Sequence, residues 1–399
     1  MIKCLTYGLG CSKEQFHSYI QTHQNPYSVA HYSFEMSLLE ELNRNSNMEI
    51  RHNYIFQESN RRLRRALIKS KEERICDTIS SNRIGFINLP VIKFFSMFFV
   101  VFYRTFVFCR KRKSDDHLIT LSTINYFPVA AANLLVSHFF PVKNILIVTD
   151  CSDSYAYNGK NVIRRLYKKA VRFLEIRYDG YVFFSGPMND YINKNNKPFC
   201  IMEGIFNKND LDFGHVEKEN AILYAGSLQP HLGVDHLIQA FLLLDNSEYE
   251  LWIIGDGDYK KELENLSNHH PRVKFLGFME RKQVFEYEKK AKVLVNVRDP
   301  KLSYTKYSFP SKTFEYMASG TPVLMTKLEC LPQEYYPHLF LIDDNNVSTI
   351  KEAMEMILSL DDETLTHKGR LASEFVKDKK NGKEQTKKVF DLIERLQEG

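Results

Sequence analysis

The sequence predicts an α/β protein made of two domains, each a parallel sheet with helices on both faces, with the two domains facing each other across a cleft. Its 399 residues suit two domains, because one domain usually takes roughly 100–200 residues. Hydrophobic residues make up 44% and charged residues 26% of the chain, which is ordinary globular usage and excludes disordered, collagen-like and polytopic membrane proteins. Apolar runs that end in glycine or a polar turn alternate with helical periodicity, a pattern typical of parallel sheets.

The second half shows this alternation most clearly. The strands expected there are 221–225, 250–254, 273–276, 293–297 and 322–325, and the expected helices are 234–244, 259–267, 283–290 and 312–319. A charged helical stretch, 362–397, follows near the end of the chain.

The first half repeats the pattern less regularly. Its expected strands are 2–7, 49–56, 118–122, 144–149 and 180–184, and its expected helices are 28–43, 129–138, 162–172 and 187–194. We therefore predict an N-terminal domain over 1–206, a C-terminal domain over 207–380, and a last helix over 381–399 that packs back toward the N-terminal domain. Open α/β sheets bind ligands at the carboxyl ends of their strands, so the cleft is the expected site.

The cysteines and histidines argue against a metal site. Seven cysteines are scattered without a CxxC pair, and the 13 histidines lack metal-ligand spacing with acidic partners, so no zinc site or metal cofactor is expected. An odd, dispersed set of cysteines indicates a reducing compartment. The first residues resemble a strand rather than a signal peptide, which predicts a cytoplasmic protein.

Charge is divided unequally along the chain. Residues 1–200 hold 28 Lys and Arg against 16 Asp and Glu, a net +12, and residues 201–399 hold 26 against 33, a net −7. Basic clusters lie at 61–65, 110–113 and 164–172, all in the basic half. Such a half suits an anionic partner, although chance variation between domains is the alternative. Nucleic acid is not expected, because no recognition motif accompanies the clusters.

An apolar run over 91–108 lies in the same half and is interrupted by Lys93 and Arg104. On a helix these two lie within about 20° of each other, which predicts a wide apolar face with a narrow basic stripe. The run is shorter than a spanning helix, which needs about 20 apolar residues. We expect contact with an anionic membrane surface; the alternative is a buried core helix with solvated basic neighbours.

The segment 307–324 carries the strongest candidate site. Ser311 is expected to cap a helix that Gly320 ends. Lys312 and Glu315 fall on a different face from the core-facing side chains. The helix start and the lysine would suit a diphosphate, and Glu315 could accept hydrogen bonds from a ribose diol. The alternative is a capped core helix with a solvated Lys/Glu face.

Ordered glycine turns precede this segment. Strands run into Gly226-Ser227, into Gly255-Asp256-Gly257 and into Gly277-Phe278. In this order and spacing, 221–358 resembles the nucleotide-sugar half of glycosyltransferase family 4, the retaining GT-B enzymes, and the first half resembles the family weakly. The resemblance implies a GT-B fold with two Rossmann-like domains.

The resemblance also implies roles for residues. Glu315 matches the second glutamate of the family's Glu-x7-Glu motif, which binds the donor ribose, and Phe278 matches the position whose backbone meets the base. Asp150 ends the strand where the family often places a His-Asp pair facing the reacting sugar. Gly226 and Ser227 match the turn that the donor phosphates approach, and Ser308, Pro310, Ser311 and Lys312 match the loop around the donor diphosphate. The glycines Gly255 and Gly257 are further donor-binding candidates.

Three departures accompany the resemblance. The first glutamate of the motif is Tyr307, the usual Arg and Lys after the first glycine turn are Ser227 and Leu232, and the histidine before Asp150 is Thr149. Lys312 and Arg298 are expected to supply the missing positive charge.

The function expected from the resemblance is a retaining hexosyltransferase. It would move a sugar from a nucleotide-diphosphate donor to a glycan acceptor carried on polyprenyl diphosphate, in capsule or exopolysaccharide synthesis, at the inner face of the cell membrane. Lys312 and Asp150 are the candidate catalytic residues. One alternative is a GT-B protein that has lost catalysis and serves another transferase as a scaffold; another is a sugar-nucleotide epimerase.

Overall fold

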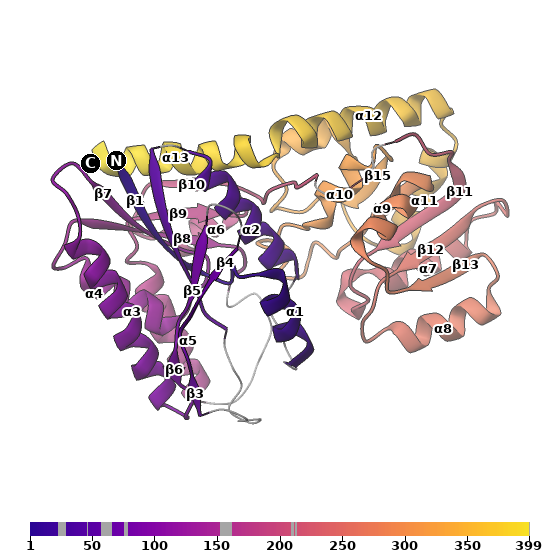
Figure 1. Ribbon diagram of the computed structural model, residues 1–399. Helices are drawn as coiled ribbons and strands as arrows, with labels where there is room; N and C mark the ends of the chain where they lie inside the picture. Colours follow the sequence, from indigo (N-terminus) through magenta and orange to yellow (C-terminus); the bar gives the residue numbers. More distant parts are fainter. Residues whose placement is uncertain are drawn as a thin grey trace. The chain divides into compact units, whose positions relative to one another are not determined.

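The computed structural model describes residues 1–22, 29–45, 47–56, 66–75, 79–151, 162–208, 211 and 214–398. The chain forms two compact units, the first from Met1–Ile205 with Gly382–Gly399, the second from Phe206–Asn381 (Figure 1). The basic cluster at 61–65 lies outside the described residues.

The first unit is built on an eight-stranded sheet in the order β10-β9-β8-β7-β1-β2-β5-β4. Its strands are β1 (Ile2–Gly8), β2 (Met48–Tyr54), β4 (Lys71–Arg74), β5 (Ser80–Arg83), β7 (His117–Ser122), β8 (Val142–Val148), β9 (Gly180–Phe183) and β10 (Phe199–Ile201). All neighbours are parallel except β4 and β5. Strands β3 (Leu67–Ile68) and β6 (Phe86–Ile87) form a separate antiparallel pair.

Helices cover both faces of this sheet (Figure 1). They are α1 (Lys13–Thr22), α2 (Val29–Asn43), α3 (Ile92–Arg110), α4 (Phe127–Val136), α5 (Val162–Glu175), α6 (Gly186–Ile192) and α13 (Gly382–Glu398). One core cluster contains Val101 of α3 and Val129 of α4. Another contains Leu38 of α2 and Leu392 of α13, so the end of the chain completes the core of the first unit.

The second unit has a six-stranded, fully parallel sheet in the order β13-β12-β11-β14-β15-β16. The strands are β11 (Glu219–Ala225), β12 (Glu250–Ile254), β13 (Val273–Gly277), β14 (Ala291–Asn296), β15 (Val323–Thr326) and β16 (Phe340–Ile342). The strand order reverses between β11 and β14, and ligands of open parallel sheets bind at the carboxyl ends beside such a reversal.

Two layers of helices enclose the second sheet. These helices are α7 (Val234–Leu242), α8 (Lys260–His269), α9 (Arg281–Lys290), α10 (Lys312–Ala318), α11 (Val347–Leu358) and α12 (Asp362–Lys379). Phe241 of α7 and Ile350 of α11 share one core cluster. Phe285 of α9 and Met317 of α10 share the other. The predicted α/β architecture of two parallel-sheet domains is confirmed.

The stretch expected to be helical at 362–397 forms two helices, α12 and α13 (Gly382–Glu398). It is interrupted between α12 and α13 at Lys380 and Asn381, where the chain passes from one unit to the other. Phe206 donates its N–H to the Lys380 carbonyl at 2.7 Å and forms a parallel bridge with Asn381. The backbone groups that would continue the helix are thus used to pair two segments distant in sequence.

The expected basic stripe on α3 is also wrong. Arg104 donates to the Asn53 side-chain oxygen at 2.5 Å and to the Arg83 carbonyl at 3.3 Å, so it ties α3 to the sheet. Lys93 is half-buried, with its ammonium 5.3 Å from the Phe94 ring centroid. In the described part of the chain, α3 is the one helix long and apolar enough to cross a membrane.

Candidate active site

A cavity of about 290 Å³ lies in the second unit where β11, β12 and β13 end. Its lining residues come from the three turns after these strands, from α9 and from the start of α10: Ala225, Gly226, Ser227, Ile254, Gly255, Asp256, Phe278, Met279, Val284 and Lys312. Five predicted site residues therefore share one cavity: Gly226, Ser227, Gly255, Phe278 and Lys312.

The glycines let neighbouring turns touch. A β-carbon on Gly255, whose φ is 152°, would lie 1.9 Å from the Gly226 carbonyl oxygen, which no other residue could tolerate. Gly226 donates its N–H to the Ile254 carbonyl, and Gly255 donates its own to the Gly277 carbonyl, at 3.0 and 2.9 Å. Gly257 does not line the cavity, but it is packed as closely: a β-carbon there would lie 2.5 Å from the Leu228 carbonyl oxygen. These contacts fix the floor of the cavity.

Phe278 forms an exposed apolar edge of the cavity. It follows Gly277, whose φ is 73°, and its side chain is 79% exposed. A planar ring in a ligand could stack on it.

Lys312 supplies positive charge to the cavity wall. Its ammonium is 2.5 Å from a Glu315 carboxylate oxygen, and the Arg281 Nε donates to the other Glu315 oxygen at 2.6 Å. Burial lowers the pKa of Lys312, but Glu288 and Glu315 outweigh it, so the net shift is upward. Burial raises the pKa of Glu315, and the two cations reverse that, so its net shift is downward. Lys312 and Glu315 are therefore both charged at neutral pH.

Glu288 is a site residue that the sequence analysis missed. It lies on α9, its side chain is fully buried, and one carboxylate oxygen is 3.8 Å from the Lys312 ammonium. Burial raises its pKa to about 8, although Lys312 opposes the rise. Its spacing in the sequence could have revealed it. Glu288 comes three positions after Phe285 and four after Val284, both buried, so it lies on the face of the helix that points to the core.

Residues 206–375 match the family model described as glycosyl transferases group 1. This match covers nearly all of the second unit and less than half of the chain. No curated protein matches the chain in sequence.

Solved structures with the same fold cover both units. Anabaena HepE in complex with UDP is 12% identical, with a TM-score of 0.67 over 98% of this chain and 100% of that one. The lipopolysaccharide outer core galactosyltransferase WaaB is 12% identical, with a TM-score of 0.68 over 98% and 99%. S. aureus TarM, solved with UDP, is 12% identical with a TM-score of 0.54 over 77% of this chain, which spans 59% of TarM. These likenesses show a GT-B fold.

The other predicted donor residues of the second unit lie near the cavity without lining it. Ser308 accepts from the Cys330 thiol at 3.5 Å through its carbonyl, and Pro310 is buried. Glu315 is held by Lys312 and Arg281. The expected cap by Ser311 is wrong: its backbone is already helical (φ −54°, ψ −28°) and its hydroxyl makes no cap bond, whereas capping needs an extended backbone. Gly320, with φ 78°, ends the helix as expected.

Arg298 follows β14 in the second unit and is half-exposed. Within the described residues, no carboxylate pairs with it. Burial raises the pKa of the Tyr224 hydroxyl to about 12, and Arg298 opposes that rise. The same hydroxyl donates to the Ser227 carbonyl at 2.9 Å, so Arg298 is close enough to add positive potential near the cavity.

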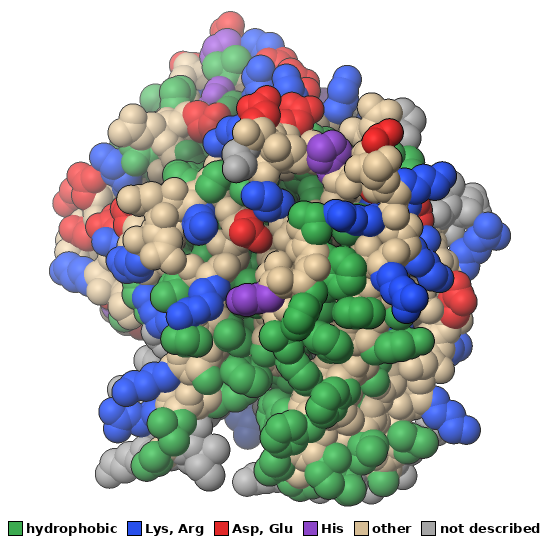
Figure 2. All heavy atoms as spheres, turned by 90° about the vertical axis from the view of Figure 1, so that its left-hand side faces the viewer, with side chains coloured by type: hydrophobic (Ala, Val, Ile, Leu, Met, Phe, Trp, Pro, Cys, Tyr) green, Lys and Arg blue, Asp and Glu red, His purple; other side chains and the backbone are tan. Residues whose placement is uncertain are grey.

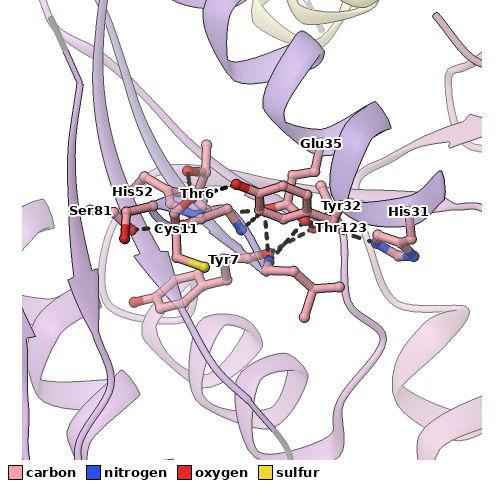
Figure 3. Close-up of polar contacts among 12 residues, drawn as sticks. Thr6, Tyr7, Cys11, His31, Tyr32, Glu35, His52, Ser81 and Thr123 are labelled. Atoms are coloured by element: carbon pink, nitrogen blue, oxygen red, sulfur yellow. Dashed lines mark hydrogen bonds and ion pairs between the residues drawn. The ribbon is translucent and has the colours of Figure 1, made fainter. Parts of the chain in front are cut away.

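Asp150 belongs to the first unit, where it is exposed just after β8. The strand order of that unit reverses between β1 and β7. A second polar group of residues lies at this reversal (Figure 3).

A buried carboxylate occupies this reversal. Glu35 of α2 accepts the N–H groups of Leu9 and Gly10 at 2.8–3.0 Å and the Thr123 hydroxyl at 2.6 Å (Figure 3). A β-carbon on Gly8 would lie 1.9 Å from a Glu35 oxygen. His52, whose pKa burial lowers while Glu35 opposes the shift, stands 3.6 Å from the carboxylate. The Glu35 carboxylate thus occupies the N–H groups of the turn after β1, which could otherwise bind an anion from solution.

Proposed function

We propose that the chain is a retaining glycosyltransferase that binds a nucleotide-diphosphate sugar in the cavity of its second unit. The observation that carries the proposal is this cavity at the carboxyl ends of β11, β12 and β13, with an ammonium on its wall and an exposed aromatic ring at its edge. The ring would stack on the base, and the ammonium would face the diphosphate. HepE and TarM were both solved with UDP, which supports a nucleotide in this fold.

The proposed reaction breaks the bond between the sugar's anomeric carbon and the diphosphate oxygen. Lys312 and Arg298 would stabilise the charge that grows on the leaving diphosphate, because fixed cations aimed at developing charge lower a barrier. The acceptor hydroxyl attacks on the same face and gives its proton to the departing phosphate oxygen. Asp150 would orient sugar or acceptor, and no metal takes part in the proposal.

We also propose a lipid-linked acceptor, a polyprenyl diphosphate glycan of capsule or exopolysaccharide synthesis, and contact with an anionic membrane surface. The contact surface would be an apolar face on the first unit whose side chains are each more than half exposed: Phe95, Phe99 and Tyr103 of α3, Phe139, and Val162, Leu166 and Phe173 of α5. Figure 2 shows hydrophobic side chains gathered on this side of the molecule, with lysine and arginine around them.

Charge and packing favour lying on the membrane over crossing it. Arg110, Lys111, Arg112 and Lys113 are exposed where α3 ends, and Arg165 and Lys169 are exposed on α5. Each basic side chain near an anionic surface adds about 1 kcal/mol of attraction. The opposite face of α3 is buried, and the Thr105 hydroxyl is hydrogen-bonded at 2.7 Å to the hydroxyl of Tyr7, which lies in the sheet. The helix is thus part of the domain.

The test of the donor site is nucleotide affinity in matched variants. Lys312→Ala should weaken UDP, GDP or ADP binding by at least about ten-fold, because a bond to a charged group contributes roughly 1.5–3 kcal/mol. Lys260→Ala removes an exposed lysine of α8, 4.0 Å from Glu264, and should change nothing. Equal affinities for both variants would refute the proposed site.

Incubation with nucleotide sugars and membrane extract tests the reaction itself. Release of nucleotide with a mass-shifted lipid is expected. If the protein binds nucleotide tightly but turns over none of the donors, loss of catalysis is favoured. If it converts a donor in the absence of an acceptor, an epimerase is favoured. A protein that binds no nucleotide would be a scaffold.

A further inference from the structure

Glu288 is a buried acid with no hydrogen bond to hold it. Neither carboxylate oxygen has a hydrogen-bond partner among the described residues, and its nearest cation is the Lys312 ammonium at 3.8 Å. Burying an ionised carboxylate without hydrogen bonds is costly. A group in this position is sensitive to any change in the charge that it faces.

Four ionisable groups face this acid. Lys312, Glu315 and Tyr316 come from α10, and Arg281 comes from α9 itself. Tyr316 is uncharged, because its hydroxyl is buried and donates to the Ala225 carbonyl at 3.0 Å. The charge that Glu288 faces is therefore set by two cations and one carboxylate.

We propose that Glu288 is a positioning residue that takes up a proton when a nucleotide diphosphate binds beside Lys312. This inference rests on the proposed donor site. A diphosphate in the cavity competes for the same ammonium and adds negative charge nearby. Ionised Glu288 would then lose its partner, so the bound state favours the neutral acid. The proton comes from solvent and adds to one carboxylate oxygen, and no other bond changes.

The direction of the pH dependence follows from linkage. The Glu288 pKa is about 8 in the free protein, and nearby negative charge raises it further in the complex. Below pH 8 the acid is already neutral, so affinity is constant. Above pH 8 the free protein must gain a proton in order to bind, so affinity falls, by about ten-fold between pH 7 and pH 9.

Calorimetry on the unaltered protein measures this proton directly. Nucleotide (UDP, GDP or ADP, whichever binds) is titrated at pH 8.5 in Tris and in EPPS, buffers with different ionisation enthalpies. Uptake of roughly 0.7 proton per nucleotide is expected from the linkage relation. Equal heats in the two buffers would overturn the inference while leaving the donor site intact.

Two glutamine variants on α9 supply the comparison. Glu288→Gln cannot ionise and should bind at pH 9 as tightly as at pH 7, without proton uptake. Glu286→Gln removes a half-exposed carboxylate that pairs with Lys289 at 3.0 Å and should keep the behaviour of the unaltered protein. Ionisation of the nucleotide base would affect the unaltered protein and both variants equally, so it does not alter the comparison. If none of the nucleotides binds at either pH, the donor site fails and this inference with it.

Discussion

Gly255 shows how one residue can fix the shape of a binding site. The carbonyl of Gly226 occupies the space in which a side chain at 255 would begin. The nearby Gly277 also has a positive φ, yet nothing lies within 4 Å of its missing β-carbon. A side chain at 255 would meet both a steric clash and an unfavourable φ, whereas one at 277 would meet the unfavourable φ alone. Comparing alanine variants at the two positions therefore separates the two contributions to stability.

Gly255→Ala should lower the free energy of unfolding by roughly 2–4 kcal/mol, since contact and strain act together. Gly277→Ala should cost only about 1 kcal/mol, for strain alone. Urea denaturation of both variants measures the difference, and equal losses would show that the 226–255 contact relaxes freely.

The positions of single site residues could be predicted from the sequence where the local strand and turn pattern determines them. The glycine turns and Lys312 converge on one cavity because parallel strands deliver their turns to one edge. Ser311 was misjudged, because its own backbone is already helical. Glu288 was missed, because its position opposite Lys312 depends on how α9 packs against α10. Nothing in either segment alone specifies that contact.

Helix α3 illustrates what an amphipathic pattern can and cannot predict. The apolar run correctly indicated a helix, but its orientation depends on Asn53, 51 positions earlier. The outward stripe is Phe95, Phe99 and Tyr103, at the spacing of one helical face. This stripe is what the membrane proposal needs.

Phe95→Ser with Phe99→Ser should reduce co-sedimentation with vesicles containing anionic phosphatidylglycerol at least several-fold, because each buried aromatic ring contributes about 1.5–3 kcal/mol. Met356→Ser alters an exposed apolar residue of α11 in the second unit and should have no effect. Binding of the unaltered protein that persists without anionic lipid would count against the role of the basic side chains.

At the scale of the molecule, the chain returns to its first unit after completing the second. Leu392 of α13 is fully buried with Leu38 and Ile145, so residues almost at the end of the sequence stabilise a sheet formed near its beginning. Sequence periodicity predicted both sheets, and the last helix expected over 381–399 begins next to the break observed at Lys380 and Asn381. Asn381 and Gly382 are poor helix formers, and the pairing of Asn381 with Phe206 accompanies the break.

Leu392→Ala should destabilise the first unit by about 2–5 kcal/mol, through lost burial and a cavity. Differential scanning calorimetry should show the transition of that unit at lower temperature while nucleotide affinity stays unchanged. Glu394→Ala, on the exposed side of the same helix, is the control. An unshifted transition would mean that α13 is dispensable to the first unit.

The carboxylate of Glu35 has a thermodynamic consequence for ligands of the first unit. Because Leu9 and Gly10 already donate to an acceptor inside the protein, the loss of conformational freedom in this turn is incurred during folding. A ligand that docks beside this turn meets a rigid surface whose two N–H groups are already used. Its association enthalpy and heat-capacity change should therefore lack the large terms that accompany coupled ordering.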